Sequence, residues 1–172
     1  MILLDGTGTA VTHIDALIDL YAEVFAEPPY YEGPEQVSCF RGLLLDEMDR
    51  PGFAVVRAVH HGTLVGMAYG FTIPAEQWWH DAATPPPPAA IGVAKFAIME
   101  LAVRQSHRGQ GLGRELLDEL LRGRTEPIAV LGVDPSTPAY AIYRGWAWRE
   151  AGHTIPKSGR SYALLLTDLP PG

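Results

Sequence analysis

The residues best suited to chemistry lie in a glycine-rich segment between an apolar run and an amphipathic pattern. The segment reads Arg104-Gln105-Ser106-His107-Arg108-Gly109-Gln110-Gly111-Leu112-Gly113-Arg114. Glycines let successive backbone N–H groups converge on an anion, and a helix beginning there adds unpaired donors and a partial positive charge. Arg108 and Arg114 could add charge-assisted contacts. The segment therefore predicts a phosphate-binding loop, with a plain tight turn as the alternative.

The spacing of the glycines narrows the choice of ligand. A nucleoside-triphosphate loop needs a Lys-Ser or Lys-Thr pair after its last glycine, and none follows here. The dinucleotide fingerprint is G-x-G-x-x-G with an acidic residue after a second strand. This chain has G-x-G-x-G late in its sequence and no repeated βαβ pattern. A nucleotide-binding domain therefore stays a weaker alternative.

The loop and its flanks match the pattern of a known family. Arg108, Gly111 and Gly113 follow the order Gln or Arg, two residues, Gly, one residue, Gly or Ala. Residues 100–103 precede the loop, and residues 139–143 form a short segment ending in tyrosine. With these residues, the sequence resembles the GNAT superfamily of acetyl-CoA-dependent N-acetyltransferases over residues 12–168. The match is specific around residues 98–122 and architectural elsewhere.

Two positions depart from the family pattern. Ser136 replaces the asparagine that often begins the short helix, and Ala147 replaces the usual glycine before Trp148. A serine hydroxyl can still cap the helix or meet a pantetheine amide. The alanine carries the expectation that this backbone position does not need a positive φ.

The resemblance implies acetyl-CoA as co-substrate. Main-chain N–H groups near Leu101 and Val103 would stabilise the thiolate and oxyanion, because family members lay pantetheine beside this strand. We expect the side chains of those two residues to pack in the core. The residues so assigned to acetyl-CoA are Leu101, Ala102, Val103, Arg108, Gly109, Gln110, Gly111, Leu112, Gly113, Arg114 and Ser136.

Acetyl transfer to an amine needs a neutral amine, a stabilised oxyanion and a proton for the leaving thiolate. Glu100 lies in an apolar run, where desolvation should raise its pKa and make it a general base. An ordinary ion pair or hydrogen bond is the alternative for Glu100. Tyr143 resembles the tyrosine that the family places beside the thioester sulfur as general acid, and core packing is its alternative.

Aromatic residues in two loops are candidates for binding the acceptor. Tyr30 and Tyr31 lie in an acidic, proline-containing loop, and Trp78 and Trp79 lie in a long connection. Such aromatics could enclose a cation. A hydrophobic lid on the sheet or a dimer contact is the alternative for the tryptophans. We expect His80 to be a surface histidine and Cys39 a buried thiol.

Charge is distributed unevenly along the chain. Residues 1–100 hold 4 Lys and Arg against 13 Asp and Glu, whereas residues 101–172 hold 9 against 7. The acidic first part disfavours nucleic acid, whose binding requires phosphate neutralisation, and favours a cationic small molecule. Five arginines between Arg104 and Arg124 could serve a phosphorylated cofactor or simply solvate helices.

The elements that must position these residues follow from hydrophobic periodicity. Thr12 reads as the N-cap of a helix that Pro28 and Pro29 end, and a second helix opens at Gly33 and Pro34. A long connection covers residues 74–92, and Gly123 should close the helix after the glycine loop with a left-handed conformation. The other expected elements are strands 53–59, 64–73, 93–103, 128–133, 146–155 and 162–166, and helices 112–121 and 138–143.

This order predicts an α/β (α+β) mixed sheet of six to seven strands with helices on both faces, in one domain over residues 1–172. One cysteine and the histidine spacing give no metal motif. No apolar run reaches the roughly 20 residues of a membrane span. With no signal-peptide pattern at the start, we expect a cytoplasmic protein without membrane partners.

The sequence thus predicts an acetyl-CoA-dependent N-acetyltransferase acting on a primary amine by direct transfer in a ternary complex. The acidic composition favours a small cationic acceptor, although protein N-termini or lysines fit the same chemistry. An aromatic loop and a hydrophobic C-terminal strand make a homodimer a reasonable expectation. The alternative in another class is a non-catalytic acyl-CoA-binding sensor or interaction module of the same fold.

Overall fold

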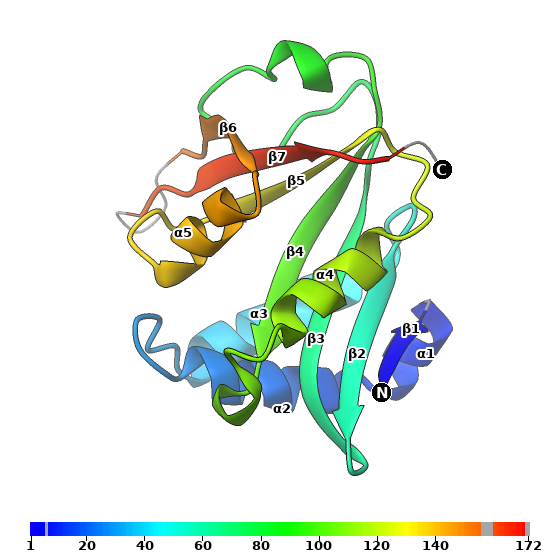
Figure 1. Ribbon diagram of the computed structural model, residues 1–172, viewed down its shortest axis with the longest axis vertical. Helices are drawn as coiled ribbons and strands as arrows, with labels where there is room; N and C mark the ends of the chain where they lie inside the picture. Colours follow the sequence, from blue (N-terminus) through cyan, green and yellow to red (C-terminus); the bar gives the residue numbers. More distant parts are fainter. Residues whose placement is uncertain (6, 156–159, 171–172) are drawn as a thin grey trace. The chain divides into compact units, whose positions relative to one another are not determined.

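The structure of the protein is a computed structural model that describes residues 1–5, 7–155 and 160–170. Seven strands form one mixed sheet in the order β1-β2-β3-β4-β5-β7-β6 (Figure 1). β4 and β5 pair in parallel, whereas β1–β2, β2–β3, β5–β7 and β6–β7 pair antiparallel. The predicted mixed sheet is confirmed. The chain divides into two compact units, residues 1–71 with 100–122 and residues 72–99 with 123–172.

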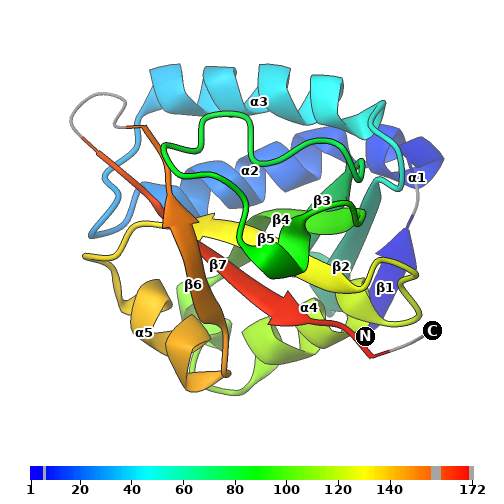
Figure 2. The same cartoon turned by 90° about the horizontal axis from the view of Figure 1, so that it is seen from above.

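The first unit holds three N-terminal helices, three strands, the end of a fourth strand and the helix after it. α2 and α3 lie on one face of β2 and β3, and α4 lies on the opposite face (Figure 1 and Figure 2). The helices therefore cover both faces, as predicted. Its elements are β1 (Ile2–Asp5), α1 (Thr7–Thr12), α2 (Ile14–Phe25), α3 (Pro34–Met48), β2 (Ala54–His60), most of β3 (Thr63–Ile73), the end of β4 (Lys95–Val103), the 3₁₀ turn η2 (Gln105–His107) and α4 (Leu112–Leu121).

The packing of β3 shows how the two faces differ. A Cβ at Gly66 would lie 2.9 Å from the Leu116 side chain, so only glycine lets α4 approach this strand so closely. Tyr69 lies three residues further along and contacts Phe40 of α3, with ring centroids 6.3 Å apart. Because side chains alternate along a strand, Gly66 faces α4 and Tyr69 faces α3.

The second unit contains the C-terminal strands and one short helix. β5 pairs with β7 along its whole length, from Ile128 opposite Asp168 to Val133 opposite Ala163. The parallel pairing of β4 with β5 runs from Lys95 opposite Ile128 to Ile98 opposite Leu131. Its elements are η1 (Pro88–Ala90), the start of β4, β5 (Ile128–Val133), α5 (Pro138–Gly145), β6 (Arg149–His153) and β7 (Ala163–Asp168).

α3 begins where the sequence predicts. Gly33 is the extended N-cap, Pro34 follows at the first helical position, and the Gly33 N–H donates a 3.0 Å hydrogen bond to Gln36 Oε1. The buried face of α3 holds Phe40, Leu44 and Met48, whereas Leu43 is 52% exposed and lies outside it. Cys39 is also exposed and is not the expected buried thiol. Residues 39 and 43 are four apart and share an outward stripe.

The N-terminal region differs from the prediction. The short apolar start forms β1, which the periodicity did not identify as a strand. Thr12 is the last residue of α1 and not an N-cap. α2 follows after His13, whose N–H donates to the Thr9 and Ala10 carbonyls at 3.2 and 3.1 Å. These bonds satisfy carbonyls at the end of α1, and the N-cap residue of α2, His13, makes no capping hydrogen bond with its side chain among the described residues.

The end of α5 also differs from the prediction. β6 begins at Arg149 and not at residue 146, because Trp146 and Ala147 still belong to the helix terminus. The Trp148 N–H donates to the Tyr143 carbonyl at 3.2 Å, and the Ala147 N–H donates to the Arg144 carbonyl at 3.1 Å. This pair of bonds is a Schellman motif, which puts its penultimate residue in the left-handed region. Ala147 accordingly has φ 66°, so the expectation of a negative φ is wrong.

A buried lysine fixes the start of the long connection after β3. Lys95, at the first position of β4, is fully buried. Its Nζ donates to the carbonyls of Pro74 at 3.1 Å, Ala75 at 3.0 Å and Gln77 at 2.5 Å. Three acceptors satisfy the three protons of the ammonium group. The lysine that interrupts the apolar run is therefore a structural clamp.

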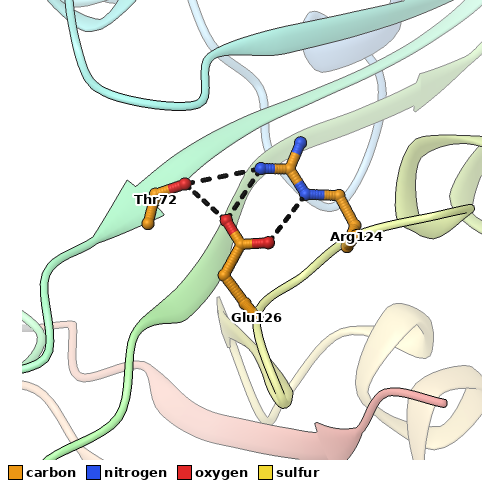
Figure 3. A network of polar contacts seen from close by, with 3 residues as sticks. All are labelled: Thr72, Arg124 and Glu126. Atoms are coloured by element: carbon orange, nitrogen blue, oxygen red, sulfur yellow. Dashed lines mark hydrogen bonds and ion pairs between the residues drawn. The ribbon is translucent and has the colours of Figure 1, made fainter. Parts of the chain in front are cut away.

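A second polar cluster involves the segment of the chain that connects α4 to β5. Arg124 donates to Glu126 through Nε at 3.1 Å and through NH2 at 2.8 Å (Figure 3). The Thr72 hydroxyl donates to Glu126 Oε1 at 2.5 Å. The Arg124 guanidinium also lies 3.7 Å from the ring centroid of Phe96. Gly123, just before this cluster, has the predicted left-handed φ, at 66°.

No helix in the described ranges combines the length and the apolar character needed to cross a membrane.

Candidate functional site

The glycine loop has the strand–turn–helix geometry that the sequence predicts. β4 ends at Val103, η2 follows, and α4 begins at Leu112. Gly109 and Gly111 have φ values of 72° and 87°, which a side chain rarely adopts. The glycines are therefore required by the backbone path that connects the strand to the helix.

The loop presents an unusual run of free backbone donors. Among the hydrogen bonds of the described residues, none is donated by the N–H groups of Gly109, Gln110, Gly111, Leu112 or Gly113. The N–H groups on either side are satisfied, since Arg108 donates to Gln105 and Arg114 donates to Gly111. Consecutive N–H groups at a helix start form a concave donor set that suits an oxyanion.

The loop arginines already have carboxylate partners. Arg108 donates through Nε to the Val103 carbonyl at 2.8 Å and through NH1 to Glu27 at 2.7 Å. Arg114 contacts Asp118 at 2.8 Å within α4. An anion at the loop would therefore meet main-chain donors first. Direct contacts from Arg108 and Arg114 stay a prediction, and they would require these ion pairs to exchange.

The end of β4 supports the loop by packing. Ala102 is buried, and its carbonyl oxygen would lie 3.3 Å from a Cβ at Gly66. The side chains of Leu101 and Val103 lie 4.0 and 3.9 Å from the position of a Cβ at Gly113. Both side chains are half-buried and do not belong to the buried core that was expected, and a role of their backbone in binding stays a prediction.

Glu100 lies one residue before this segment, and its pKa is raised to about 8. Burial is the largest cause, the charges of Glu32 and Glu47 act in the same direction, and a hydrogen bond from the Leu101 backbone opposes them. The predicted desolvation effect is confirmed. Within the described part of the chain, Glu100 takes part in no ion pair. A carboxyl group whose pKa lies near 8 is suited to accept a proton from an ammonium ion.

Two further carboxylates raise the pKa of Glu100 by their charge, and each accepts a hydrogen bond from a tyrosine. Tyr69 donates to Glu47 Oε2 at 2.7 Å, and Tyr21 donates to Glu32 Oε2 at 2.5 Å. Burial raises the pKa of Glu47, although the Tyr69 hydrogen bond opposes the shift. Sequence reasoning missed Glu47, Tyr21 and Tyr69 because they come from different elements. The only sequence signal was the acidic balance of the first 100 residues.

A pocket opens beside Glu32 between α2 and α3. Its volume is about 540 Å³, and its walls are mostly apolar. Tyr21, which donates to Glu32, stacks on Phe40 with ring centroids 3.8 Å apart, and this contact fixes the tyrosine ring. The lining residues are Ile18, Ala22, Glu32, Gly33, Pro34, Val37, Ser38 and Arg41.

The two tyrosines predicted to bind the acceptor differ in exposure. Tyr30 packs edge-on against Phe25, with ring centroids 4.8 Å apart. Tyr31 is 73% exposed and has φ 54°. Only Tyr31 therefore presents a large free surface.

In the second unit, the two tryptophans of the long connection cover the sheet. Trp78 packs on a cluster formed by Ala90, Ile128 and Leu166. Trp79 lies 3.3 Å from the position of a Cβ at Gly132 in β5. These contacts match the lid that was the alternative, and acceptor binding by the tryptophans stays a prediction. His80 is exposed, as expected.

Ser136 lies just before the short helix α5, and Tyr143 lies in its last turn. Ser136 bonds to Asp134 Oδ1 through its N–H at 2.9 Å and its hydroxyl at 2.6 Å. The N-cap of α5 is Thr137, so the expectation that Ser136 caps this helix is wrong. Tyr143 is buried, with edge-on ring contacts to Trp146 at 5.7 Å and Trp148 at 5.9 Å. Ser136 therefore belongs to an Asx turn with Asp134, and its hydroxyl donates to that carboxylate and not to the helix.

Comparison with solved structures shows the same fold. An aminoglycoside 6′-acetyltransferase type Ii superposes with a TM-score of 0.68 at 18% identity, covering 100% of this chain and 99% of that one. Arabidopsis thaliana NAA60, in complex with a bisubstrate analogue, gives 0.68 at 15% identity and covers 100% of both chains. The PaiA N-acetyltransferase of Thermoplasma acidophilum, in complex with coenzyme A, gives 0.65 at 12% identity, with 98% and 99% covered.

No curated protein sequence matches the chain. A sequence model of the acetyltransferase (GNAT) family matches residues 14–146, which include β4, the glycine loop, α4 and all of α5. The chain therefore belongs to the GNAT family of acetyltransferases.

Proposed function

We propose that the protein transfers an acetyl group from acetyl-CoA to a primary amine, by direct transfer while both substrates are bound. The observation that carries this proposal is the run of free N–H donors from Gly109 to Gly113. These donors fit a pyrophosphate, which offers several oxyanions at close spacing. Acetyl-CoA, when bound, supplies the activated acetyl thioester.

The acetyl-CoA contacts would divide between loop and strand. The main chain of residues 109–113 would bind the phosphates, and the backbone N–H groups near Leu101 and Val103 would stabilise negative charge at the reacting end. Arg108 and Arg114 would add charge if they exchange their present partners. Ser136, which is exposed, would offer its hydroxyl to a pantetheine amide.

Glu100 would act as the general base. An amine arrives at neutral pH as an ammonium ion, and it becomes nucleophilic only after losing a proton. The Glu100 carboxylate accepts this proton, directly or through a water molecule. Its pKa of about 8 lies closer to that of an amine than an ordinary carboxyl group does, which makes the transfer more favourable.

Tyr143 would act as the general acid. When the thioester is cleaved, the leaving thiolate needs a proton, and a phenol can donate one. Tyr143 lies in the last turn of α5, in the position that the family resemblance assigns to this role. Its edge-on contacts with Trp146 and Trp148 would hold the ring in one orientation.

The acceptor would be a small cationic molecule. The acidic first part of the chain and the carboxylates of Glu32 and Glu47 beside Glu100 favour a positive charge. One similar structure is an aminoglycoside acetyltransferase, and another is a ribosomal-protein-alanine N-acetyltransferase of Brucella melitensis. The charge balance, and not this likeness, favours the small molecule.

Two measurements test the proposal. Calorimetric titration with acetyl-CoA, ATP and NAD should show acetyl-CoA binding most tightly, and tighter binding of either nucleotide would overturn it. A thiol assay for released CoA should then respond to a polyamine or an amino-sugar. Binding without turnover of any amine, including a peptide N-terminus, would favour the acyl-CoA sensor.

A further inference from the structure

Three histidines meet at one end of the first unit. His60 ends β2, His61 follows in the β2–β3 turn, and His107 ends η2. His60 Nδ1 lies 3.1 Å from His107 Nε2. The His60 ring centroid lies 4.2 Å from that of His61 and 5.2 Å from that of His107. The family signature and the proposed mechanism use none of these rings.

The contact between His60 and His107 is a hydrogen bond that depends on protonation. One ring nitrogen must carry the proton and the other must accept it. Ser106 Oγ lies 2.9 Å from His107 Nδ1 and so helps to set the tautomer of that ring. The pair can gain one proton and keep the hydrogen bond. A second proton would place two N–H groups face to face and break it.

Among the described residues, the groups whose charge shifts the pKa of His60 are all cationic or become cationic on protonation. The charge of His61 has the largest effect in lowering the pKa of His60, and His107 and the N-terminal amino group act in the same direction. That amino group donates to the Val59 carbonyl at 3.0 Å. Within the described residues, no carboxylate forms an ion pair with the three histidines. Nothing there compensates for protonation of both rings.

The histidine pair is connected directly to the glycine loop. At the start of η2, the Arg104 N–H donates to the Val65 carbonyl of β3 at 2.9 Å. At its end, His107 is held by His60, and Arg108 follows immediately. Gln110 of the loop donates through Nε2 to the Ser106 carbonyl at 3.3 Å. The loop therefore follows a turn that is held to β3 at Arg104 and to His60 at His107, next to the contacts of Arg108 with Val103 and Glu27.

We infer that His60 is a positioning residue for the acetyl-CoA loop, which it holds through His107, and that this contact opens when both rings are protonated. The inference rests on the proposed function, since it takes residues 109–113 as the acetyl-CoA loop. Backbone donors bind an anion best when they are fixed in advance, because ordering them on binding costs free energy. Opening the contact therefore weakens acetyl-CoA binding.

The described residues contain no group of three or more His, Cys, Asp or Glu side chains that could hold a metal ion. The direct contact within the cluster is the hydrogen bond between His60 and His107.

The test is acetyl-CoA affinity as a function of pH in matched variants. His60→Ala should weaken binding about two- to tenfold at pH 7.5, the range expected for one lost hydrogen bond. His60→Gln should keep the affinity, because its amide can donate and accept without titrating. The control is His61→Asn, which removes a neighbouring ring and suits the left-handed φ of 47° at this position.

The pH series separates positioning from simple packing. The wild-type affinity should fall between pH 7.5 and pH 5.5 toward that of His60→Ala, and the affinity of His60→Gln should fall less. The titration of acetyl-CoA itself affects every variant equally. Equal pH dependence in wild type and His60→Gln, or an unchanged affinity in His60→Ala, would overturn the inference.

Nuclear magnetic resonance of the ligand-free protein keeps the test independent of the proposed function. The imidazole nitrogen shifts of His107 and the amide shifts of Gly109 and Gly111 should titrate together in the wild type. In His60→Gln the glycine amides should not follow that titration. If the glycine amide shifts do not change with the titration of His107 in the wild type, the inference that His60 holds the loop through His107 is wrong. Absence of acetyl-CoA binding at every pH would instead refute the proposed function.

Discussion

The phenol of Tyr69 donates a 2.7 Å hydrogen bond to Oε2 of Glu47, which joins the middle of β3 to the end of α3. Burial raises the pKa of Tyr69 well above its usual value, and the charge of Glu47 raises it further. Tyr69 therefore stays a neutral donor throughout the working pH range. The bond keeps a second carboxyl group near Glu100, whose pKa Glu47 helps to raise.

This relationship predicts the pH dependence of catalysis. The base is active when deprotonated, so kcat/KM should rise with pH through about 8. Glu47→Gln removes a nearby negative charge, lowers the pKa of Glu100 and moves this limb to lower pH. Glu100→Gln should abolish the limb and lower kcat/KM about 10²- to 10⁴-fold. Glu35→Gln, an exposed change at the start of α3, is the control. An unmoved limb in Glu47→Gln would contradict the coupling.

The proposed acid predicts a separation of binding from turnover. Tyr143→Phe should keep the affinity for acetyl-CoA and lower kcat about 10²-fold, because the ring remains and only the proton donor is lost. Tyr140→Phe changes the same atom one turn earlier in α5, where the hydroxyl donates to Glu150. It should leave kcat unchanged. Steady-state rates and calorimetry distinguish the two variants, and equal kcat in both would rule out the acid role.

The glycine loop predicts a contrast between neighbouring alanine variants. Gly111 has φ 87°, so Gly111→Ala strains the loop and should weaken acetyl-CoA binding about tenfold. A Cβ at Gly113 would meet only ordinary contacts at 3.9 and 4.0 Å, so Gly113→Ala should bind normally. Calorimetric titration provides the comparison. Equal affinities would show that the backbone path of Gly111 does not control the site.

The Arg124–Glu126 pair predicts an acid-sensitive contribution to stability. Burial alone would raise the pKa of Glu126, but hydrogen bonds from Arg124 and Thr72 hold it below the usual value. The contribution is therefore present above the unfolded pKa of about 4.3 and is lost as pH falls through the lower folded pKa. Glu126→Gln should lower the free energy of unfolding by about 3 kcal/mol at pH 7.

Urea denaturation at pH 7 and pH 3.5 measures this contribution. The difference between wild type and Glu126→Gln should shrink at the lower pH. The matched control is Glu119→Gln, which breaks the pair between a half-buried glutamate and the exposed Arg122 and should cost less than about 1 kcal/mol. A pH-independent difference for Glu126→Gln would mean that the ion pair does not stabilise the fold.

The left-handed alanine predicts a stabilising substitution. Ala147→Gly should raise the free energy of unfolding by about 1 kcal/mol, because glycine adopts φ 66° without steric cost. Ala141→Gly, the same change inside α5, should lower it by about 1 kcal/mol. Thermal denaturation of the two variants should therefore give shifts of opposite sign. Destabilisation by both changes would contradict the account of the helix terminus.

Local patterns made part of this site predictable. The glycine spacing required a strand–turn–helix connection, and the structure has it. The position of Glu100 among apolar residues was enough to predict its raised pKa. The start of α3 followed from Gly33 and Pro34, because capping depends on adjacent residues.

Features that depend on distant contacts were not predictable. Glu47 and Tyr69 approach Glu100 only after α3 packs on β3, and no sequence spacing links them. Ala147 indicated a negative φ, but the Schellman hydrogen bonds at the end of α5 impose a positive one. Asp134 takes up the hydroxyl of Ser136, which therefore does not cap α5.

The most direct test of the central claim follows an isotopic label from acetyl-CoA. The purified protein is incubated with acetyl-labelled acetyl-CoA and a cell extract, and mass spectrometry tracks the label separately in metabolites and polypeptides. Enzyme-dependent label in a small cationic amine, appearing far more slowly with Glu100→Gln, is the predicted result. Label confined to polypeptides would contradict the proposed acceptor. Measurable acetyl-CoA binding with no enzyme-dependent label would contradict the proposed catalysis.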